Sequence, residues 1–462
     1  MMLSLDFVGF PQVFAPILAE ASNTEETAPL VLAGVLLSLM VVYLASKLGG
    51  EVSKWLGLPP VLGELVSGVL VGVSALHLLV FPEGGVDAST SVLMVGLQTL
   101  MGTSTETINQ VFQSQGEIIS VLAELGVIIL LFEIGLESDL KELQKVGYQA
   151  ATVAVVGVVA PFVLGTLGLM MIFHVAALPA IFAGAALTAT SIGITSKVLS
   201  ELGQLRSREG QIIVGAAVMD DVLGIIVLAV VASLAKTGDV SITNVVTLIL
   251  SASGFLLGAI VVGRGFNKVF GPISERLQTR GNLVIPALTF ALALAFVAQV
   301  VHLEAILGAF AAGLVLDETD QRKELDQQII PIADVLVPIF FVTVGARADL
   351  SVLNPLYPEN RAGLIIATFL IVVAILGKTI TGWAVFGKEP VNRLAVGVGM
   401  IPRGEVGLVF AGIGAASGTL NRPLEAAIIT MVILTTLLAP LLLRWAFREE
   451  AASVESADLA SS

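Results

Sequence analysis

Long apolar segments separated by short polar ones make up most of this 462-residue chain. A helix that crosses a bilayer needs about 20 mostly apolar residues, and thirteen segments reach or approach that length. The ninth is short, and Gln299, His302 and Glu304 mark its boundary with the eighth. The pattern predicts an all-α polytopic membrane protein. The predicted spans are 28–48, 59–80, 118–137, 147–173, 177–199, 211–235, 243–263, 283–301, 303–316, 329–346, 362–386, 392–417 and 424–446.

Composition agrees with this pattern and excludes other classes. Charged residues make up 13% of the chain, where soluble domains carry about 25%, so a soluble enzyme is excluded. The net charge of −14 comes mostly from acids in loops and tails and does not indicate a nucleic-acid partner. There is no cysteine, and the three histidines each stand alone at a segment end. We therefore expect neither an enzyme nor a cofactor.

The distribution of basic residues predicts the orientation. Seventeen of the 23 Lys and Arg lie in alternate loops or at the C-terminal end, which places that end in the cytoplasm and the N-terminus outside. Residues 1–27 lack a basic leader region and form a predicted outer segment rather than a signal peptide. The stretch 88–101 is either an interfacial helix or a loop. The acidic, Ser- and Ala-rich residues 447–462 are predicted to be a disordered cytoplasmic tail.

Similar segments recur seven spans apart. Because seven is odd, the two copies cross the membrane in opposite directions, and such inverted repeats build secondary transporters. Apolar helices also resemble one another by chance, but three pairs in the same order make that explanation weaker. We expect spans one to six and eight to thirteen to be the repeats, with 243–263 as a linker helix. The pairs are 122–140 with 332–350, 62–71 with 307–316 and, more weakly, 191–195 with 405–409.

Asp220 and Asp221 are the most informative charges, because they lie near the middle of the sixth span. An ionisable group at the centre of a span costs at least about 2.5 kcal/mol and indicates function. Successive helical residues point about 100° apart, so one carboxylate is free to pair with a cation on another helix while its neighbour faces an aqueous cavity. The alternative is that both only tie helices together.

Lys378 lies inside the eleventh span, beside Gly377. It is either a buried ammonium that pairs with one aspartate and carries a proton, or a side chain that extends to the interface.

Two spans contain helix-breaking residues. Thr190 and Ser191 lie beside Gly193 in the fifth span, and Arg403 and Glu405 lie among Pro402, Gly404 and Gly407 in the twelfth. Unwound backbone inside a membrane faces protein or a water-filled cavity, where freed carbonyls bind cations. Alternatively, the hydroxyls bond back to their own helix, and Arg403 and Glu405 form a structural bridge. Glu64, in the second span, either lines a cavity or supports packing.

Over roughly 30–446 the chain resembles the monovalent cation:proton antiporter-2 family, in its sodium/proton branch. The resemblance rests on Asp220-Asp221, the segment TATS at 188–191, Gly377-Lys378 and the segment PRGE at 402–405. It implies an inverted-repeat antiporter fold with two broken, crossing helices. It also implies a dimerisation domain (28–137 and 283–346), an ion-translocating core (147–235 and 362–446) and a homodimer.

The same resemblance implies roles for individual residues. Asp221 would bind Na⁺ or a proton in competition, with oxygens of Thr190 and Ser191 as further Na⁺ ligands. Asp220 would form a salt bridge with Lys378. Independently of the resemblance, the positions of Arg403, Glu405 and Glu64 inside spans make them expected supporting residues of the site.

Electrogenic exchange of Na⁺, and of Li⁺ as a further substrate, for H⁺ by alternating access is therefore the expected function. Potassium/proton exchange is the alternative. An intramembrane hydrolase is disfavoured because adjacent aspartates on one helix do not face each other, and a channel is disfavoured by the inverted repeats. The expected surroundings are membrane lipid, in a prokaryotic inner membrane or an internal photosynthetic membrane.

Overall fold

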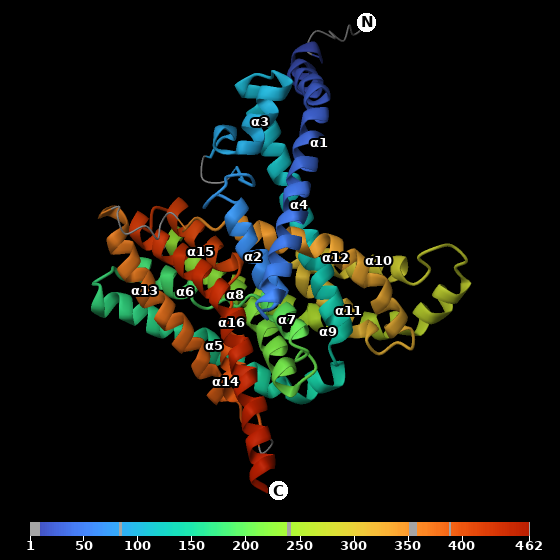
Figure 1. Ribbon diagram of the computed structural model, residues 1–462, viewed down its shortest axis with the longest axis vertical. Coiled ribbons are helices and arrows are strands. Elements are labelled where there is room, and N and C mark those ends of the chain that lie inside the picture. The colour runs from blue at the N-terminus through green and yellow to red at the C-terminus, as the bar shows by residue number, and fades with distance from the viewer. Residues whose placement is uncertain (1–9, 83–85, 238–241, 351–357, 388–389, 462) are drawn as a thin grey trace, which may run out of the picture. The chain divides into compact units, whose positions relative to one another are not determined.

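The computed structural model describes residues 10–82, 86–237, 242–350, 358–387 and 390–461, and every regular element in these ranges is a helix (Figure 1). Eight of the helices are long and apolar enough to cross a membrane. The first half of the chain contains α1 (Phe10–Trp55), α2 (Pro60–Val71), η1 (Ala88–Thr90), α3 (Val92–Met101), α4 (Thr105–Glu137), α5 (Leu140–Ile172), α6 (Ala177–Ala186), α7 (Ile192–Glu201) and α8 (Arg208–Thr237). The second half contains α9 (Ile242–Arg276), α10 (Val284–Val300), α11 (Ala305–Leu316), α12 (Arg322–Ala346), α13 (Pro358–Thr379), η3 (Ile380–Ala384), α14 (Arg393–Gly399), α15 (Glu405–Ala416) and α16 (Arg422–Ser461).

Each of the thirteen predicted spans overlaps at least one helix, and the fifth and twelfth are interrupted as predicted. The second span is shorter than predicted, since α2 ends at Val71 and the chain then turns, with Leu78 donating to the carbonyl of Val71. Of the two alternatives for 88–101, the structure has a helix, because Ser91 caps α3 by accepting a hydrogen bond from the amide of Met94.

Helix α16 continues to Ser461, where we predict a disordered tail from 447. The Ala- and Glu-rich sequence of this stretch favours a helix, and it extends a helix that has already formed, so it bears no nucleation cost.

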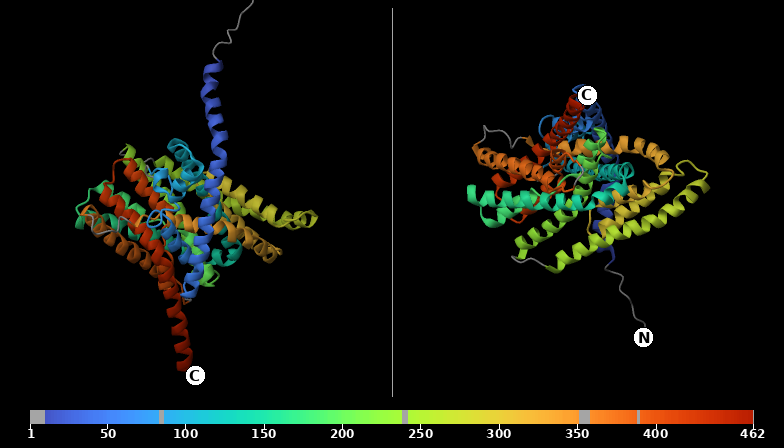
Figure 2. Two further views of the ribbon diagram at one scale, coloured as in Figure 1. Left: turned by 45° about the horizontal axis from the view of Figure 1, so that its top comes forward. Right: turned by 90° about the horizontal axis from the view of Figure 1, so that it is seen from below.

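Two compact units make up the chain. The first comprises 1–48, 64–124 and 338–349, and the second comprises 49–63, 125–337 and 350–462. In the first unit, Met94, Ile108 and Phe112 belong to a buried apolar cluster. In the second, α5 packs against α8 and α13, α13 packs against α16, and α9 lies beside α11 and α10 (Figure 2). A larger apolar cluster there contains Phe182, Phe410 and Met431.

The inverted repeat is visible in two equivalent helix crossings. In the second unit, a Cβ added to Gly135 would lie 2.4 Å from the Phe310 carbonyl oxygen, and one on Gly313 would lie 2.2 Å from that of Phe132. These glycines let α4 and α11 approach closely. The crossing is therefore as tight as backbone contact allows.

In the first unit the positions that correspond in the repeat form the same crossing. A Cβ on Gly345 would lie 2.1 Å from the Leu65 oxygen, and one on Gly68 would lie 2.4 Å from the Val342 oxygen. The contact between α2 and α12 thus repeats the contact between α11 and α4, atom for atom, in the other half of the sequence.

Candidate functional site

The two interrupted helices meet where their backbones are unwound. Helix α6 ends at Ala186 and α7 begins at Ile192, while α14 ends at Gly399 and α15 begins at Glu405. The amide of Ser191 donates to the Pro402 carbonyl at 2.8 Å, and the Thr190 hydroxyl donates to the Met400 carbonyl at 3.2 Å. Each segment therefore supplies part of the hydrogen bonding that the other lost by unwinding.

Close approach at this crossing depends on Gly404. A Cβ at that position would lie 3.2 Å from both Cβ and Oγ of Ser191. Thr190 and Ser191 are buried, at 3% and 8% exposed. The hydroxyls and carbonyls of the crossing thus lie inside the protein, where hard oxygen ligands suit an alkali cation.

Helix α8 carries both aspartates past this crossing. Gly224, one turn beyond them, would place a Cβ 3.9 Å from that of Ala189 in the unwound segment. Oδ2 of Asp220 accepts a hydrogen bond from Nζ of Lys378 at 3.1 Å, and both side chains are fully buried. Asp221 is 4% exposed and lies within electrostatic range of the same ammonium.

Lys378 reaches Asp220 because α13 lies close to α5. A Cβ on Gly377 would be 3.0 Å from Cα of Pro161, and one on Gly157 would be 3.3 Å from Nζ of Lys378. The absence of side chains on both helices gives the lysine stem room to run between them. The buried ammonium is thus held by packing as well as by its ion pair.

Arg403 is a second buried cation, at 1% exposed. Its Nη1 donates to the Ala189 carbonyl at 2.5 Å, while Nε and Nη2 have no hydrogen-bond partner in the part of the chain that the structure describes. The charge of Arg403 acts on both Asp220 and Lys378. The site therefore holds two carboxylates and two cations within one apolar surrounding.

Two further hydroxyl groups donate hydrogen bonds to backbone carbonyls at the crossing. They are not among the site residues predicted from the sequence. Thr195 donates to the Gly399 carbonyl at 3.0 Å, and Thr436 donates to the Arg403 carbonyl at 2.7 Å. Thr436 lies in the apolar run ILTTLLAPLL. Two adjacent hydroxyl residues in such an apolar run indicate a polar contact inside the protein. The sequence does not say which backbone group they contact.

The remaining two predicted residues are Glu405 and Glu64. Glu405 begins α15, and its side chain lies outside the described residues. Glu64 belongs to the first unit, where its Oε1 accepts a hydrogen bond from the Ser46 hydroxyl at 2.8 Å. Asp220, Asp221, Thr190, Ser191, Lys378 and Arg403 all belong to the second unit.

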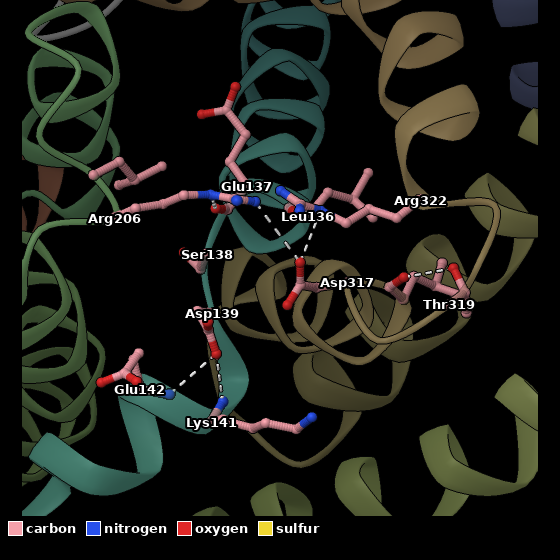
Figure 3. A network of polar contacts seen from close by, with 12 residues as sticks. Leu136, Glu137, Ser138, Asp139, Lys141, Glu142, Arg206, Asp317, Thr319 and Arg322 are labelled. Carbon is pink, nitrogen blue, oxygen red and sulfur yellow. Dashed lines mark hydrogen bonds and ion pairs between the residues drawn. The ribbon is translucent and has the colours of Figure 1, made fainter.

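A separate polar network lies at the junction of α4 and α5 (Figure 3). Arg206 donates to the Glu137 carbonyl at 2.7 Å, and Arg322 donates to the Leu136 carbonyl at 2.8 Å, so two guanidinium groups satisfy the C-terminus of α4. Asp317 accepts from Arg322 at 2.7 Å and lies 3.9 Å from Arg206. Burial nevertheless raises the pKa of Asp317 to about 6, with Arg206 opposing the shift.

Comparison with known proteins identifies relatives of this chain. A family model described as "Sodium/hydrogen exchanger, transmembrane" matches residues 35–449. The chain is 64% identical over 436 residues to the high-affinity Na⁺/H⁺ antiporter NhaS3 of Synechocystis sp., with 94% of each protein covered. It is 32% identical to the Na⁺/H⁺-K⁺ antiporter GerN of Bacillus cereus, with 88% of this chain and 95% of GerN covered.

A solved structure has a similar fold. The sodium proton antiporter MjNhaP1 from Methanocaldococcus jannaschii, at pH 8, matches with a TM-score of 0.58 at 17% identity. The match covers 91% of this chain and 97% of that one. At this identity the likeness concerns the fold, which is the antiporter fold predicted from the sequence.

Proposed function

The chain belongs to the sodium/hydrogen exchanger family, and from this premise we propose that it is a secondary Na⁺/H⁺ antiporter of a membrane that it crosses many times. The observation that carries the proposal is the fully buried Asp220–Lys378 pair next to Asp221, where two unwound helices cross. A 64% identical relative named as a high-affinity Na⁺/H⁺ antiporter supports the same function.

Competition at Asp221 couples the two ions. The carboxylate of Asp221 binds Na⁺ together with oxygens of Thr190 and Ser191, and it binds a proton when Na⁺ is absent. One carboxylate in a buried site does not hold both, because the bound ion neutralises the charge that attracts the other. If the core crosses the membrane only when Asp221 is occupied, the gradient of one ion drives the other.

Lys378 makes the exchange electrogenic. A cation that enters beside the aspartates competes with the ammonium for Asp220. A buried ammonium without its carboxylate partner is costly, so Lys378 releases its proton as the cation binds. Arg403 keeps its charge throughout, because a guanidinium is not deprotonated in proteins, and it holds the crossing to Ala189.

The moving part is the core formed by 147–235 and 362–446, and the scaffold formed by 28–137 and 283–346 pairs with a second copy of the chain. The N-terminus is outside and the C-terminus cytoplasmic, as the positive-inside bias predicts. Helix α9 links the two repeats. Potassium/proton exchange is the second candidate, favoured by the GerN relative, whose name includes K⁺.

Transport by the purified protein in liposomes tests the proposed function. A pH-sensitive dye inside the vesicles reports proton movement when Na⁺, Li⁺ or K⁺ is added outside. We expect a Na⁺ response in the wild type and none in Asp221→Asn, with the exposed-site variant Asp320→Asn as the matched control. A K⁺ response without a Na⁺ response would establish the second candidate, and a full Na⁺ response in Asp221→Asn would refute the site.

A further inference from the structure

The C-terminal end of α7 and the loop that follows it are bonded to the ends of α2 and α4, through residues that all belong to the second unit. The Ser200 hydroxyl donates a hydrogen bond to Oε2 of Glu137, in the last turn of α4, at 2.9 Å. Nε of Arg206 donates to the carbonyl of Glu137 at 2.7 Å (Figure 3). Oε2 of Glu201 accepts a hydrogen bond from the amide of Val61, in the first turn of α2, at 3.3 Å. The sodium site makes no use of these contacts.

These bonds join two parts of the chain that move relative to each other under the proposed function. The end of α7 and its loop lie in the proposed core, whereas Val61 and Glu137 lie in the proposed scaffold. The loops beside these residues are on the side with the excess of basic residues, which we propose is cytoplasmic. When packed elements slide past one another, the contacts at their boundary break or are exchanged for others. The bonds of Ser200, Glu201 and Arg206 therefore have to break when the core crosses.

Breaking the contact of Arg206 leaves no buried charge without a partner. The side chain of Arg206 is 53% exposed, so its guanidinium group returns to water. Asp317, whose Oδ1 lies 3.9 Å from Nη2 of Arg206, keeps its 2.7 Å hydrogen bond from Nε of Arg322 (Figure 3). Arg322 also stays on the carbonyl of Leu136. Because an exposed ion pair contributes little stability, this contact opens and closes again at a small cost in free energy.

Two buried polar side chains lie one helical turn deeper in the membrane than these bonds. Ser196 lies on the same face of α7 as Ser200, is fully buried, and its Oγ has no hydrogen-bond partner among the described residues. Glu133 precedes Glu137 by one turn of α4, is 9% exposed, and its Oε2 likewise has no partner in the described ranges. The charge of Lys197, on α7, acts on the Glu133 carboxylate across this contact. A buried polar atom without a partner is costly, and both atoms gain water if α7 and α4 separate here.

We propose that Ser200, Glu201 and Arg206 form a latch, through their bonds to Val61 and Glu137, that closes the cytoplasmic end of the boundary between core and scaffold. The latch is closed in this structure. Opening it gives water access to the buried side chains behind it and lets ions pass between the crossing helices and the cytoplasm. The inference rests on the proposed function, because only a core that moves against a scaffold has to be released.

Labelling of a single thiol in the purified protein tests the latch without any transport. The chain contains no cysteine, so Ser196→Cys places one thiol behind the latch by exchanging a single atom. We expect a water-soluble maleimide to label this thiol about fivefold faster when Arg206→Gln is added, the upper end of the effect of one exposed ion pair. Arg208→Gln is the matched control, because Arg208 bonds to Gln149 inside the core, and we expect labelling within about twofold of Ser196→Cys alone. Equal labelling rates in the two arginine variants would overturn the proposal.

Cross-linking tests whether the latch has to open during exchange. In the variant Ser200→Cys, Glu137→Cys, a short bifunctional methanethiosulfonate joins α7 to α4. We expect Na⁺-driven proton flux in liposomes to fall about tenfold or more after cross-linking and to recover when dithiothreitol removes the reagent. The control pair, Glu142→Cys with Lys145→Cys, places two thiols one turn apart on α5, and its flux is expected to change by less than about twofold.

The outcomes separate the latch from the proposed function on which it rests. Full exchange by the protein cross-linked between α7 and α4 would overturn the latch and leave the antiporter in place. Absence of Na⁺-driven proton flux in the wild type would refute the proposed function itself. The labelling rates do not depend on transport, so they test the closed contact in either case.

Discussion

At the scale of single residues, the candidate site is a group of charged side chains buried inside apolar helices. Asp220, Asp221 and Lys378 are costly inside apolar spans, and the sequence alone marks them. Their partners are tertiary facts. Nothing in the sequence indicates that Arg403 meets the carbonyl of Ala189, because that contact depends on how two unwound segments cross.

The buried ion pair between Lys378 and Asp220 is expected to affect the stability of the folded protein. Lys378→Gln leaves Asp220 buried without its cation, and breaking such a pair costs roughly 3–5 kcal/mol of the free energy of unfolding. We expect the double variant Asp220→Asn, Lys378→Gln to recover most of that loss, because it leaves no uncompensated charge. Thermal unfolding in detergent measures both. If the single variant is as stable as wild type, the pair does not exist in the folded protein.

At the scale of elements, hydropathy predicted which segments form helices better than where the helices end. Helix α9 continues to Arg276 although its apolar run ends at 263, and α4 begins at Thr105 rather than at 118. An apolar run reports contact with lipid, whereas a helix continues for as long as its backbone hydrogen bonds do. The interruptions were predictable because Pro and Gly remove or weaken those bonds.

The crossing of the interrupted helices makes a prediction about exchange. Gly404→Val adds atoms where only 3.2 Å separates a Cβ from Ser191, so the two unwound segments are forced apart. We expect Na⁺-driven proton flux in liposomes to fall at least tenfold. Gly412→Val is the matched control, because Gly412 lies in α15, the helix that begins directly after Gly404, and a Cβ there would have nothing within 4 Å. Equal flux in the two variants would show that the close approach is not needed.

At the scale of the whole molecule, the inverted repeat sets up equivalent contacts between helices in the two halves of the sequence. The crossing of α2 with α12 and that of α11 with α4 use corresponding glycines of the two repeats. The repeat was visible in the sequence from a constant offset of 210 between 122–140 and 332–350. Which spans belong to a moving core remains a proposal, since it depends on motion rather than on contacts.

The network around Asp317 makes a prediction about pH. Its pKa is raised to about 6, against about 4 for an exposed aspartate, so the folded protein binds more protons than the unfolded chain between these values. The contribution of Asp317 to stability is then full below about pH 4 and is lost as the pH rises through about 6.

Melting curves between pH 4 and 8 measure this effect. The facing groups are Arg206 and Arg322, the acids Asp139 and Glu318, and the amide of Leu140. We expect the difference in melting temperature between wild type and Asp317→Asn to change between pH 4 and 6 and to stay constant above. Asp320→Asn, in the same loop, serves as the control. A difference that does not vary with pH would contradict the raised pKa.

Competition between Na⁺ and H⁺ at Asp221 is the central claim, and equilibrium binding of radioactive Na⁺ tests it most directly. We predict that the apparent Kd of the purified wild-type protein rises as the pH falls, by up to about a hundredfold for each pH unit on the acidic side of the binding transition, because Na⁺ displaces one proton from Asp221 and one from Lys378. Asp221→Asn is predicted to show no saturable binding at any pH. Saturable Na⁺ binding in Asp221→Asn, or a wild-type affinity that does not depend on pH, would contradict the account.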